Sequence, residues 1–303
     1  MKKRILSLLL AAAMLVLLAV PALAEDEHAY TYVALGDSIT TGVGLSDAAF
    51  QQTATGFDVT GNYHGYSSDC YVARVADALG LDRDHAINYG MPAAMSGNMV
   101  ELVQTGSTHS GTVNYDIPQL REDLKNADLI TVLIGSNDTV VRLMGALGTA
   151  TNGKSTQFLY PMLLGGLREI NTQTLEAFLN NMQYLDWTCD EQKAALQFLT
   201  SGIQPILDQS RTETVSNLEQ ILQELKALNP DAQVILLGYY NPLPILPGYA
   251  SYFCQMNQSV KALASQYGAD YVPIPLTATA NDGHPTIAGH KYIARQIVKA
   301  VRK

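Results

Sequence analysis

The stretch Tyr32–Thr40 reads YVALGDSIT and joins an apolar run to a Gly-Asp-Ser turn. Such a change is typical of a buried strand, a tight turn and the start of a helix. We expect Gly36 to supply the backbone freedom of the turn and Ser38 to lie among free N–H groups in the first helical turn. A serine placed there can act as a nucleophile beside an oxyanion held by those groups. Because Gly-Asp-Ser also forms ordinary turns, the interpretation depends on the rest of the chain.

The first 24 residues have the pattern of a secretory signal peptide. Positions 2–4 are basic, an apolar run broken only by Ser7 covers 5–20, and Ala22-Leu23-Ala24 fits a cleavage site. The run is short for a membrane anchor, and no cysteine lies at the cleavage site. We therefore expect residues 25–303 to be secreted and to carry no membrane anchor after cleavage.

Charge and cysteine content bear on partners and redox state. Loss of three of the 19 basic residues with the signal leaves 16 against 28 acidic ones, a net charge of −12. This surface argues against nucleic acid or an anionic membrane as the main partner. Cys70, Cys189 and Cys254 are widely spaced, so the sequence leaves their pairing open. No metal-ligand spacing is present, and we expect neither a metal nor a cofactor.

Five short apolar runs alternate with helical patterns over residues 25–303. The runs cover residues 32–35, 85–89, 128–134, 234–240 and 270–274. The helical patterns cover 69–79, a segment ending near 102, a segment starting at 116, then 214–228, 251–267 and 286–301. Residues 46–68 and 105–114 have the composition of loops. This alternation predicts a single α/β domain in three layers, with a five-stranded parallel sheet between helices.

Residues from 139 to about 210 depart from this alternation and predict a helical insert. They are rich in Leu, Met and Ala, with glycines as breaks. The run Phe158–Leu164 is too apolar for a solvated loop. One hypothesis is that the insert covers the site and lines an acyl pocket. The alternative is that its helices bury apolar area elsewhere.

Polar turns follow four of the expected strands. The turns are Gly36-Asp37-Ser38, residues 88–93, Gly135-Ser136-Asn137-Asp138, and Asn281-Asp282-Gly283-His284-Pro285. In a parallel sheet, ligands bind at the carboxyl ends of the strands. We therefore expect these four turns, distant in sequence, to meet at one edge of the sheet.

The chain resembles the SGNH hydrolases, the family of GDSL-type esterases and lipases. The resemblance rests on four blocks in order: Gly36-Asp37-Ser38, Asn88-x-Gly90-x-Pro92-Ala93, Gly135-x-Asn137-Asp138, and Asp282-Gly283-His284-Pro285. It spans the chain from Tyr30 to the C-terminus apart from the insert. It implies the flavodoxin-like SGNH hydrolase fold and a serine enzyme that acts on ester bonds.

The resemblance also implies a role for each matched residue. Ser38 would attack the ester carbonyl, and His284 would accept its proton and return it to the leaving alcohol. The backbone N–H groups of Ser38 and Ala93 and the side-chain amide of Asn137 would form the oxyanion hole. The family usually has Gly at the position of Ala93, and a register that uses Gly97 stays open.

Three groups are candidates for orienting His284. The family places an acidic residue three positions before the His, where this chain has Asn281. Asp282 carries a charge but lies only two positions away. A backbone carbonyl is the third candidate. We predict Asp282, because Gly283 can adopt conformations that bring its carboxylate to the ring.

The sequence predicts a secreted serine esterase or lipase that acts on a small-molecule or glycan ester. Two alternatives remain open. An acyltransferase would pass the same acyl group to a sugar or glycan hydroxyl, and a non-catalytic member of the fold would bind a glycan without turnover. Fold alone does not decide among these, nor does it define the acyl chain.

Overall fold

The computed structural model describes residues 29–46, 51–53, 56–58, 63–110, 113–155, 186–242 and 248–301, together with residues 172, 176 and 180. The expected signal peptide and the apolar run Phe158–Leu164 lie outside the described residues.

The five expected strands form one parallel sheet. They are β1 (Tyr32–Gly36), β4 (Ala86–Gly90), β7 (Leu129–Leu133), β8 (Gln233–Leu237) and β9 (Asp270–Val272). The strand order is β4-β1-β7-β8-β9, and every neighbouring pair is parallel. The chain moves outward from β1 to β4 and then returns to the other side of β1 at β7. In open α/β sheets, ligands bind at the carboxyl ends of the strands on either side of such a reversal, which here are β1 and β7.

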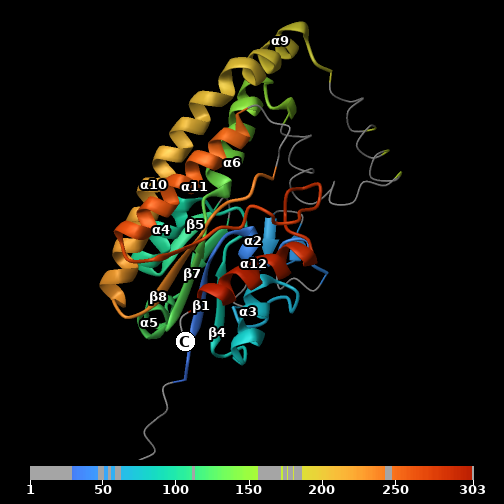
Figure 1. The fold of residues 1–303 in the computed structure, drawn as a ribbon. Coiled ribbons are helices and arrows are strands. Elements are labelled where there is room, and N and C mark those ends of the chain that lie inside the picture. Colours follow the sequence, from blue (N-terminus) through green and yellow to red (C-terminus); the bar gives the residue numbers. More distant parts are fainter. Residues whose placement is uncertain are drawn as a thin grey trace, which may run out of the picture.

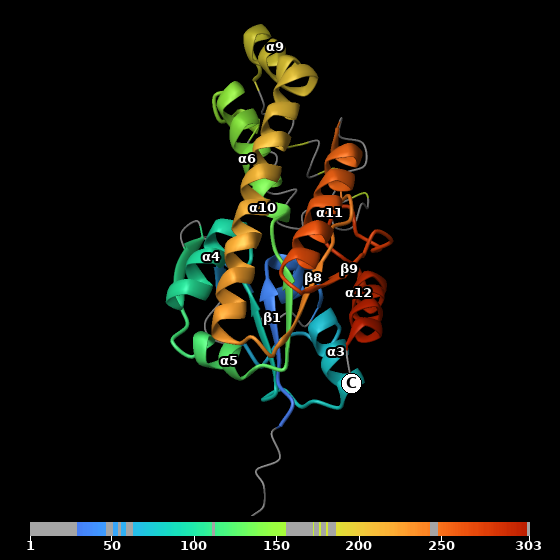
Figure 2. The same ribbon diagram turned by 60° about the vertical axis from the view of Figure 1, so that its left-hand side comes forward.

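Helices cover both faces of the sheet, which confirms the three-layer α/β/α architecture (Figures 1 and 2). Alternate side chains of β1 divide between the two cores: Val33 and Leu35 join one, and Tyr32 and Ala34 join the other. The first core is closed by α4 (Ser96–Thr105), α5 (Leu120–Asn126), α10 (Ile203–Leu228) and α11 (Tyr249–Gln266). The second is closed by α3 (Tyr71–Leu79) and α12 (Ile287–Ala300).

Three local expectations are wrong. Within the expected loop 105–114, Ser107–Ser110 (β5) pairs with β6 (Val113–Asp116) in an antiparallel hairpin. The expected loop 46–68 likewise contains β2 (Gln51–Thr53) paired with β3 (Gly56–Asp58). The helix expected to start at 116 starts at Leu120.

The helical segment between β7 and β8 projects beyond the sheet (Figure 1). Its described elements are α6 (Ser136–Ala150), α9 (Cys189–Gln197), a π-helical turn (Phe198–Gly202) and α10. We expected the last helix to start at residue 214, but α10 starts at Ile203 and runs 26 residues without a break. The position near 210, expected to end the insert, therefore lies inside a continuous helix that also covers the sheet.

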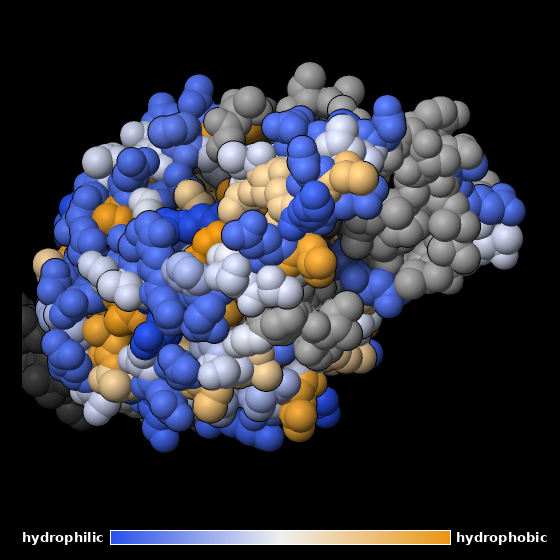
Figure 3. Space-filling model, turned by 90° about the horizontal axis from the view of Figure 1, so that it is seen from above, coloured by the Kyte–Doolittle hydropathy of each residue, from blue (hydrophilic) through white to orange (hydrophobic). Residues whose placement is uncertain are grey.

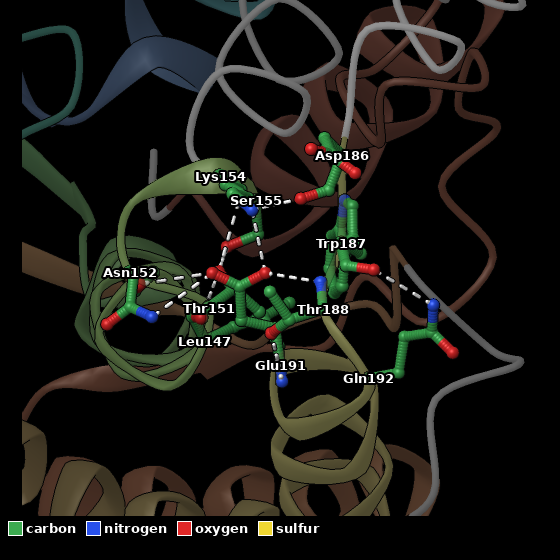
Figure 4. A network of polar contacts seen from close by, with 11 residues as sticks. Leu147, Thr151, Asn152, Lys154, Ser155, Asp186, Trp187, Thr188, Glu191 and Gln192 are labelled. Carbon is green, nitrogen blue, oxygen red and sulfur yellow. Dashed lines mark hydrogen bonds and ion pairs between the residues drawn. The ribbon is translucent and has the colours of Figure 1, made fainter.

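A polar network joins the end of α6 to the start of α9 (Figure 4). The Glu191 carboxylate accepts hydrogen bonds from Asn152 Nδ2 at 3.1 Å, Lys154 Nζ at 2.8 Å and the Thr188 N–H at 2.8 Å. The Thr188 hydroxyl in turn accepts the Glu191 N–H, completing a capping box. Chiefly because of Lys154, the pKa of Glu191 is lowered to about 2. We call these four residues the Glu191 network.

The end of the molecule from which these helices project has a mixed surface. Viewed onto this end, hydrophobic residues form separate patches among hydrophilic ones (Figure 3). Among the described residues, the large apolar side chains that are exposed are Val141, Leu196, Leu276 and Ile287. Of the helices in the described ranges, none combines the length and hydrophobicity needed to cross a bilayer.

Candidate active site

The four polar turns lie at the carboxyl ends of the strands, as the alternation of strands and helices predicted. Ser38 follows β1, Ala93 follows β4, Asn137 follows β7, and His284 lies on the connection from β9 to α12. The site therefore lies at the carboxyl ends of the strands, where the strand order reverses.

Ser38 is held by a turn with very little space around it. It is the first residue of the four-residue helix α2 (Ser38–Thr41), and the Asp37 carboxylate caps this helix by accepting the Ile39 N–H at 2.9 Å. A Cβ on Gly36 would lie 2.0 Å from Thr40 Oγ1 and 2.6 Å from the Leu133 carbonyl oxygen. Gly36 does not have a positive φ. Glycine is required there for close approach, and the expectation that it supplies turn flexibility is wrong.

Asn88 ties the Ser38 turn to the neighbouring strand. Its Nδ2 donates to the Thr40 carbonyl at 2.8 Å, and its Oδ1 accepts the Gly90 N–H at 3.0 Å. A Cβ on Gly90 would lie 2.6 Å from the Thr41 nitrogen. From the sequence alone, Asn88 and Gly90 were matched to the second family block but were given no separate role. Their positions show that they hold α2 against the end of β4.

The imidazole of His284 lies between Ser38 and Asp282. His284 Nε2 is 3.0 Å from Ser38 Oγ, and His284 Nδ1 is 3.2 Å from Asp282 Oδ2. The other carboxylate oxygen of Asp282 accepts the His284 N–H at 3.1 Å. The Asp282 side chain is fully buried, which strengthens its interaction with the ring. These three side chains have the order of a nucleophile, a base and an orienting carboxylate.

The backbone between Asp282 and His284 makes this contact possible. Gly283 has a φ of 83°, in the left-handed region that favours glycine. The Tyr240 hydroxyl donates to the Gly283 carbonyl at 2.9 Å, and the Ala280 N–H donates to the His284 carbonyl at 2.9 Å. Of the three candidates for orienting His284, the geometry favours Asp282. Asn281 lies exposed on the same loop.

Two of the expected oxyanion donors lie on adjoining segments. Asn137 Nδ2 donates one hydrogen to the Ala94 carbonyl at 2.9 Å, which leaves its second hydrogen for a ligand. Ala93 has a φ of 62°, so it occupies a conformation that glycine adopts more easily. This explains why the position suits Gly in the family pattern. Gly97, the other register, is the second residue of α4.

Asp37 brings a second buried carboxyl group to the site. It is 1% exposed, and among the described residues its Oδ2 has no hydrogen-bond partner. Burial raises the pKa of Asp37 to about 7, against the opposing effects of the Ile39 N–H and of His284. From the sequence alone, Asp37 was given no role. The structure makes it the cap of α2 and a group that can titrate near neutral pH.

Asp138 bonds a residue far away in the sequence. It is 1% exposed, and its carboxylate accepts hydrogen bonds from the N–H and the hydroxyl of Ser96, 42 positions away. Burial raises the pKa of Asp138, while the bonds from Ser96 oppose the rise. It therefore links the start of α6 to the start of α4.

Of the described residues, the other histidines and the cysteines lie outside this arrangement. The buried ring of His290 accepts the Tyr71 N–H through Nδ1 at 3.2 Å and stacks with the ring of Tyr71. Cys189 and Cys254 are exposed, and Cys70 Sγ caps α3. In the part of the chain that is described, no group of His, Cys, Asp or Glu side chains has the arrangement of a metal site.

Comparison with known proteins identifies the family and the fold. A family model described as "GDSL-like Lipase/Acylhydrolase family" matches residues 34–292. An extracellular lipase from Streptomyces rimosus is 16% identical with a TM-score of 0.50, over 90% of this chain and 100% of that one. The lipase Lip_vut3 from a goat rumen metagenome is 14% identical with a TM-score of 0.52, over 90% and 97%. No curated protein matches the chain.

Proposed function

The chain belongs to the GDSL-like lipase/acylhydrolase family, and from that premise we propose that it is a secreted esterase or lipase that cleaves carboxylic esters through Ser38. Membership of this family makes it a serine ester hydrolase. The assignment of Ser38, His284, Asp282, Ala93 and Asn137 to roles, the secretion and the kind of ester are the proposal.

In this proposal, Ser38 Oγ attacks the ester carbonyl while its proton passes to His284 Nε2. The N–H groups of Ser38 and Ala93 and the free amide hydrogen of Asn137 bind the oxyanion that forms. The carbon–oxygen bond to the alcohol then breaks, and the alcohol leaves with the proton from His284. Water attacks the acyl-enzyme by the same route and releases the acid and Ser38. Asp282 stabilises the imidazolium in both steps.

The contact that most directly supports the proposal is the one between His284 Nε2 and Ser38 Oγ. These atoms are 3.0 Å apart although the residues are 246 positions apart in sequence. A general base must lie within about 2.6–3.2 Å of the proton it accepts. Secretion is supported by the basic start, apolar run and Ala-x-Ala site of the first 24 residues.

The test is a hydrolysis series on p-nitrophenyl esters from acetyl to long acyl chains, run beside an O-acetylated polysaccharide. Ser38→Ala should lose roughly 10⁴-fold or more in kcat while keeping its fold. A fluorophosphonate should label Ser38 in the wild type and nothing in the variant. Ser251→Ala, at an exposed serine of α11, is the matched control and should keep full activity. Labelling that persists in Ser38→Ala would remove the assignment.

A further inference from the structure

Asp138 lies at a junction of three helices beside the expected oxyanion donors. Its Oδ2 accepts the Ser96 N–H at 2.8 Å, and its Oδ1 accepts the Ser96 hydroxyl at 2.6 Å. The Ser96 oxygen also accepts a hydrogen bond from Asn217 Nδ2 of α10 at 2.8 Å. The Ser210 hydroxyl of α10 donates to the Asp138 carbonyl at 2.9 Å. The starts of α4 and α6 are therefore joined to each other and to α10.

The same two segments carry the oxyanion donors. Asn137 directly precedes Asp138, and Ala93 lies three residues before Ser96. A second bond crosses between these segments, from Asn137 Nδ2 to the Ala94 carbonyl at 2.9 Å. Two neighbouring cross-links restrict sliding and rotation of one segment against the other. These contacts of Asp138 and Asn137 join the two donor segments directly, in addition to the pairing of β4 and β7 with β1.

We propose that Asp138 is a positioning residue that, by fixing Ser96, holds Asn137 at the distance from Ala93 that an oxyanion requires. This inference rests on the proposed function of the site. A carboxylate suits the role because both its oxygens accept, and Ser96 presents two donors to it. An amide in the same place would meet one of those donors with its own NH2. The backbone of Ala93 also needs to be held in place, since its left-handed conformation is less favourable for Ala than for Gly.

A merely structural role is the alternative, because Asp138 also joins α6 to α10. The chain offers a matched comparison for that role. The ion pair between Arg142 and Glu213 also joins α6 to α10, one turn beyond Asp138 on α6. Within the described residues, Glu213 accepts hydrogen bonds from Arg142 and Gln209, and Arg142 acts on Asp138 through its charge. Loss of that pair should therefore weaken the attachment of α6 without moving the donors.

The experiment compares Asp138→Asn with Glu213→Gln, each alone and combined with Asn137→Ala. In Asp138→Asn, kcat on p-nitrophenyl acetate should fall about 10²-fold, the scale for a misplacement of about 1 Å, with KM changed less than about twofold. The rate of fluorophosphonate labelling at Ser38 should fall with it. Because the loss acts through Asn137, Asp138→Asn should cost less than about threefold in the Asn137→Ala background. Glu213→Gln should keep kcat at the wild-type value.

Ser96→Ala gives a second measurement if Asp138→Asn does not fold. It removes the hydroxyl but keeps the N–H bond to Asp138, so we expect a loss of about tenfold, again absent in the Asn137→Ala background. Unchanged kcat in either folded variant, or losses that add fully to that of Asn137→Ala, would overturn the inference. A wild type that neither hydrolyses esters nor reacts with the fluorophosphonate would instead overturn the proposed function.

Discussion

The edge of the sheet and the joint between α6 and α9 hold their side chains by different means. At the edge of the sheet, Asn88, Asp138 and Asp282 are buried, and Gly36 meets its neighbours with no space for a methyl group. In the Glu191 network, buried Glu191 pairs with Lys154, whose side chain is 30% exposed, and the pair joins two helix ends. Side chains that are buried in close contact with their neighbours are held in fixed positions. An ion pair near solvent is instead weakened by salt and by acid. We therefore expect changes at the edge of the sheet to reduce catalysis and changes at the Glu191 network to loosen the structure.

The largest effect that separates the candidate partners of His284 should come from Asp282→Asn. The amide carries no charge to stabilise the imidazolium and can turn its NH2 toward the ring. In the serine-protease template this replacement lowers kcat by about 10⁴-fold. Asn281→Ala should leave kcat within a few-fold of the wild type. Steady-state kinetics on p-nitrophenyl acetate measures both.

Asn281→Asp sharpens this test, because it restores the acidic residue at the position usual in the family. If Asn281→Asp raised kcat strongly while Asp282→Asn left it unchanged, Asp282 would not be the orienting group. Circular dichroism of each variant is the control, since both residues lie on the tight loop that Gly283 shapes.

Asn137→Ala should have the next largest effect. It removes one donor to the oxyanion, which costs roughly 10²–10³-fold in kcat in comparable sites. KM should change little, because the charge that Asn137 stabilises develops only in the transition state. An unchanged kcat would leave Asn137 with the structural task of holding the Ala94 carbonyl.

The sequence predicted the sheet well because its strands are short apolar runs between polar turns. It predicted the start of α10 poorly, since Ser210 and Thr214 are fully buried and interrupt the apolar pattern. Ser210 is buried there because its hydroxyl bonds the carbonyl of Asp138, a contact between residues 72 positions apart. The β5–β6 hairpin was missed for a related reason. Its first strand is polar throughout, so alternating burial leaves no alternation in hydrophobicity.

The candidate site was predictable as a set of residue types and less so as geometry. Four turns at strand ends suggested Ser38, Asn137 and His284. The choice between Asp282 and Asn281 depends on the φ of Gly283, which spacing does not define. Gly36 was assigned to turn flexibility because spacing does not show that Thr40 folds back against it, or that Leu133 of β7, about a hundred residues further along the chain, lies beside it. Sequence patterns do not define contacts between residues that are distant in the sequence.

Asp37→Asn should change how stability depends on pH. Burial raises the pKa of Asp37 from 3.8 to about 7, so the folded chain binds a proton that the unfolded chain has lost over this range. The wild type should therefore lose stability as pH rises from about 4 to about 7, by up to roughly 4 kcal/mol. Asn has no such proton, and its Oδ1 can still accept the Ile39 N–H. Urea unfolding at the two pH values measures the difference.

The control for this prediction is Asp77→Asn, at an exposed position on α3. Each substitution also alters packing, so the stabilities themselves are not compared. The quantity to compare is the stability lost between the two pH values in each variant and in the wild type, because it isolates the charge of Asp37. If Asp37→Asn and the wild type lost stability in parallel from about pH 4 to about pH 7, Asp37 would not be the buried titrating group.

The smallest effect on catalysis should come from Glu191→Gln, at the Glu191 network. Gln cannot form the ion pair with Lys154, so residues 151–155 and 188–192 should exchange their amide hydrogens faster. The pKa of Glu191 is lowered from 4.5 to about 2, so its contribution is present above about pH 4.5 and is lost as pH falls toward 2. Hydrogen exchange in the wild type should show this loss, and the variant should not. The kcat on p-nitrophenyl acetate should stay unchanged.

Asp190→Asn is the matched control, because Asp190 lies next to Glu191 and pairs with Lys193 at 3.7 Å while its side chain is 95% exposed. Exposed pairs of this kind contribute little, so exchange should stay at the wild-type rate. Faster exchange in Glu191→Gln alone would show that the buried member of the network joins the two helices. Equal exchange in both variants would make the Glu191 network no stronger than a surface pair. A fall in kcat in Glu191→Gln would instead break the contrast, because it would mean that the joint between α6 and α9 helps to set the geometry at the edge of the sheet.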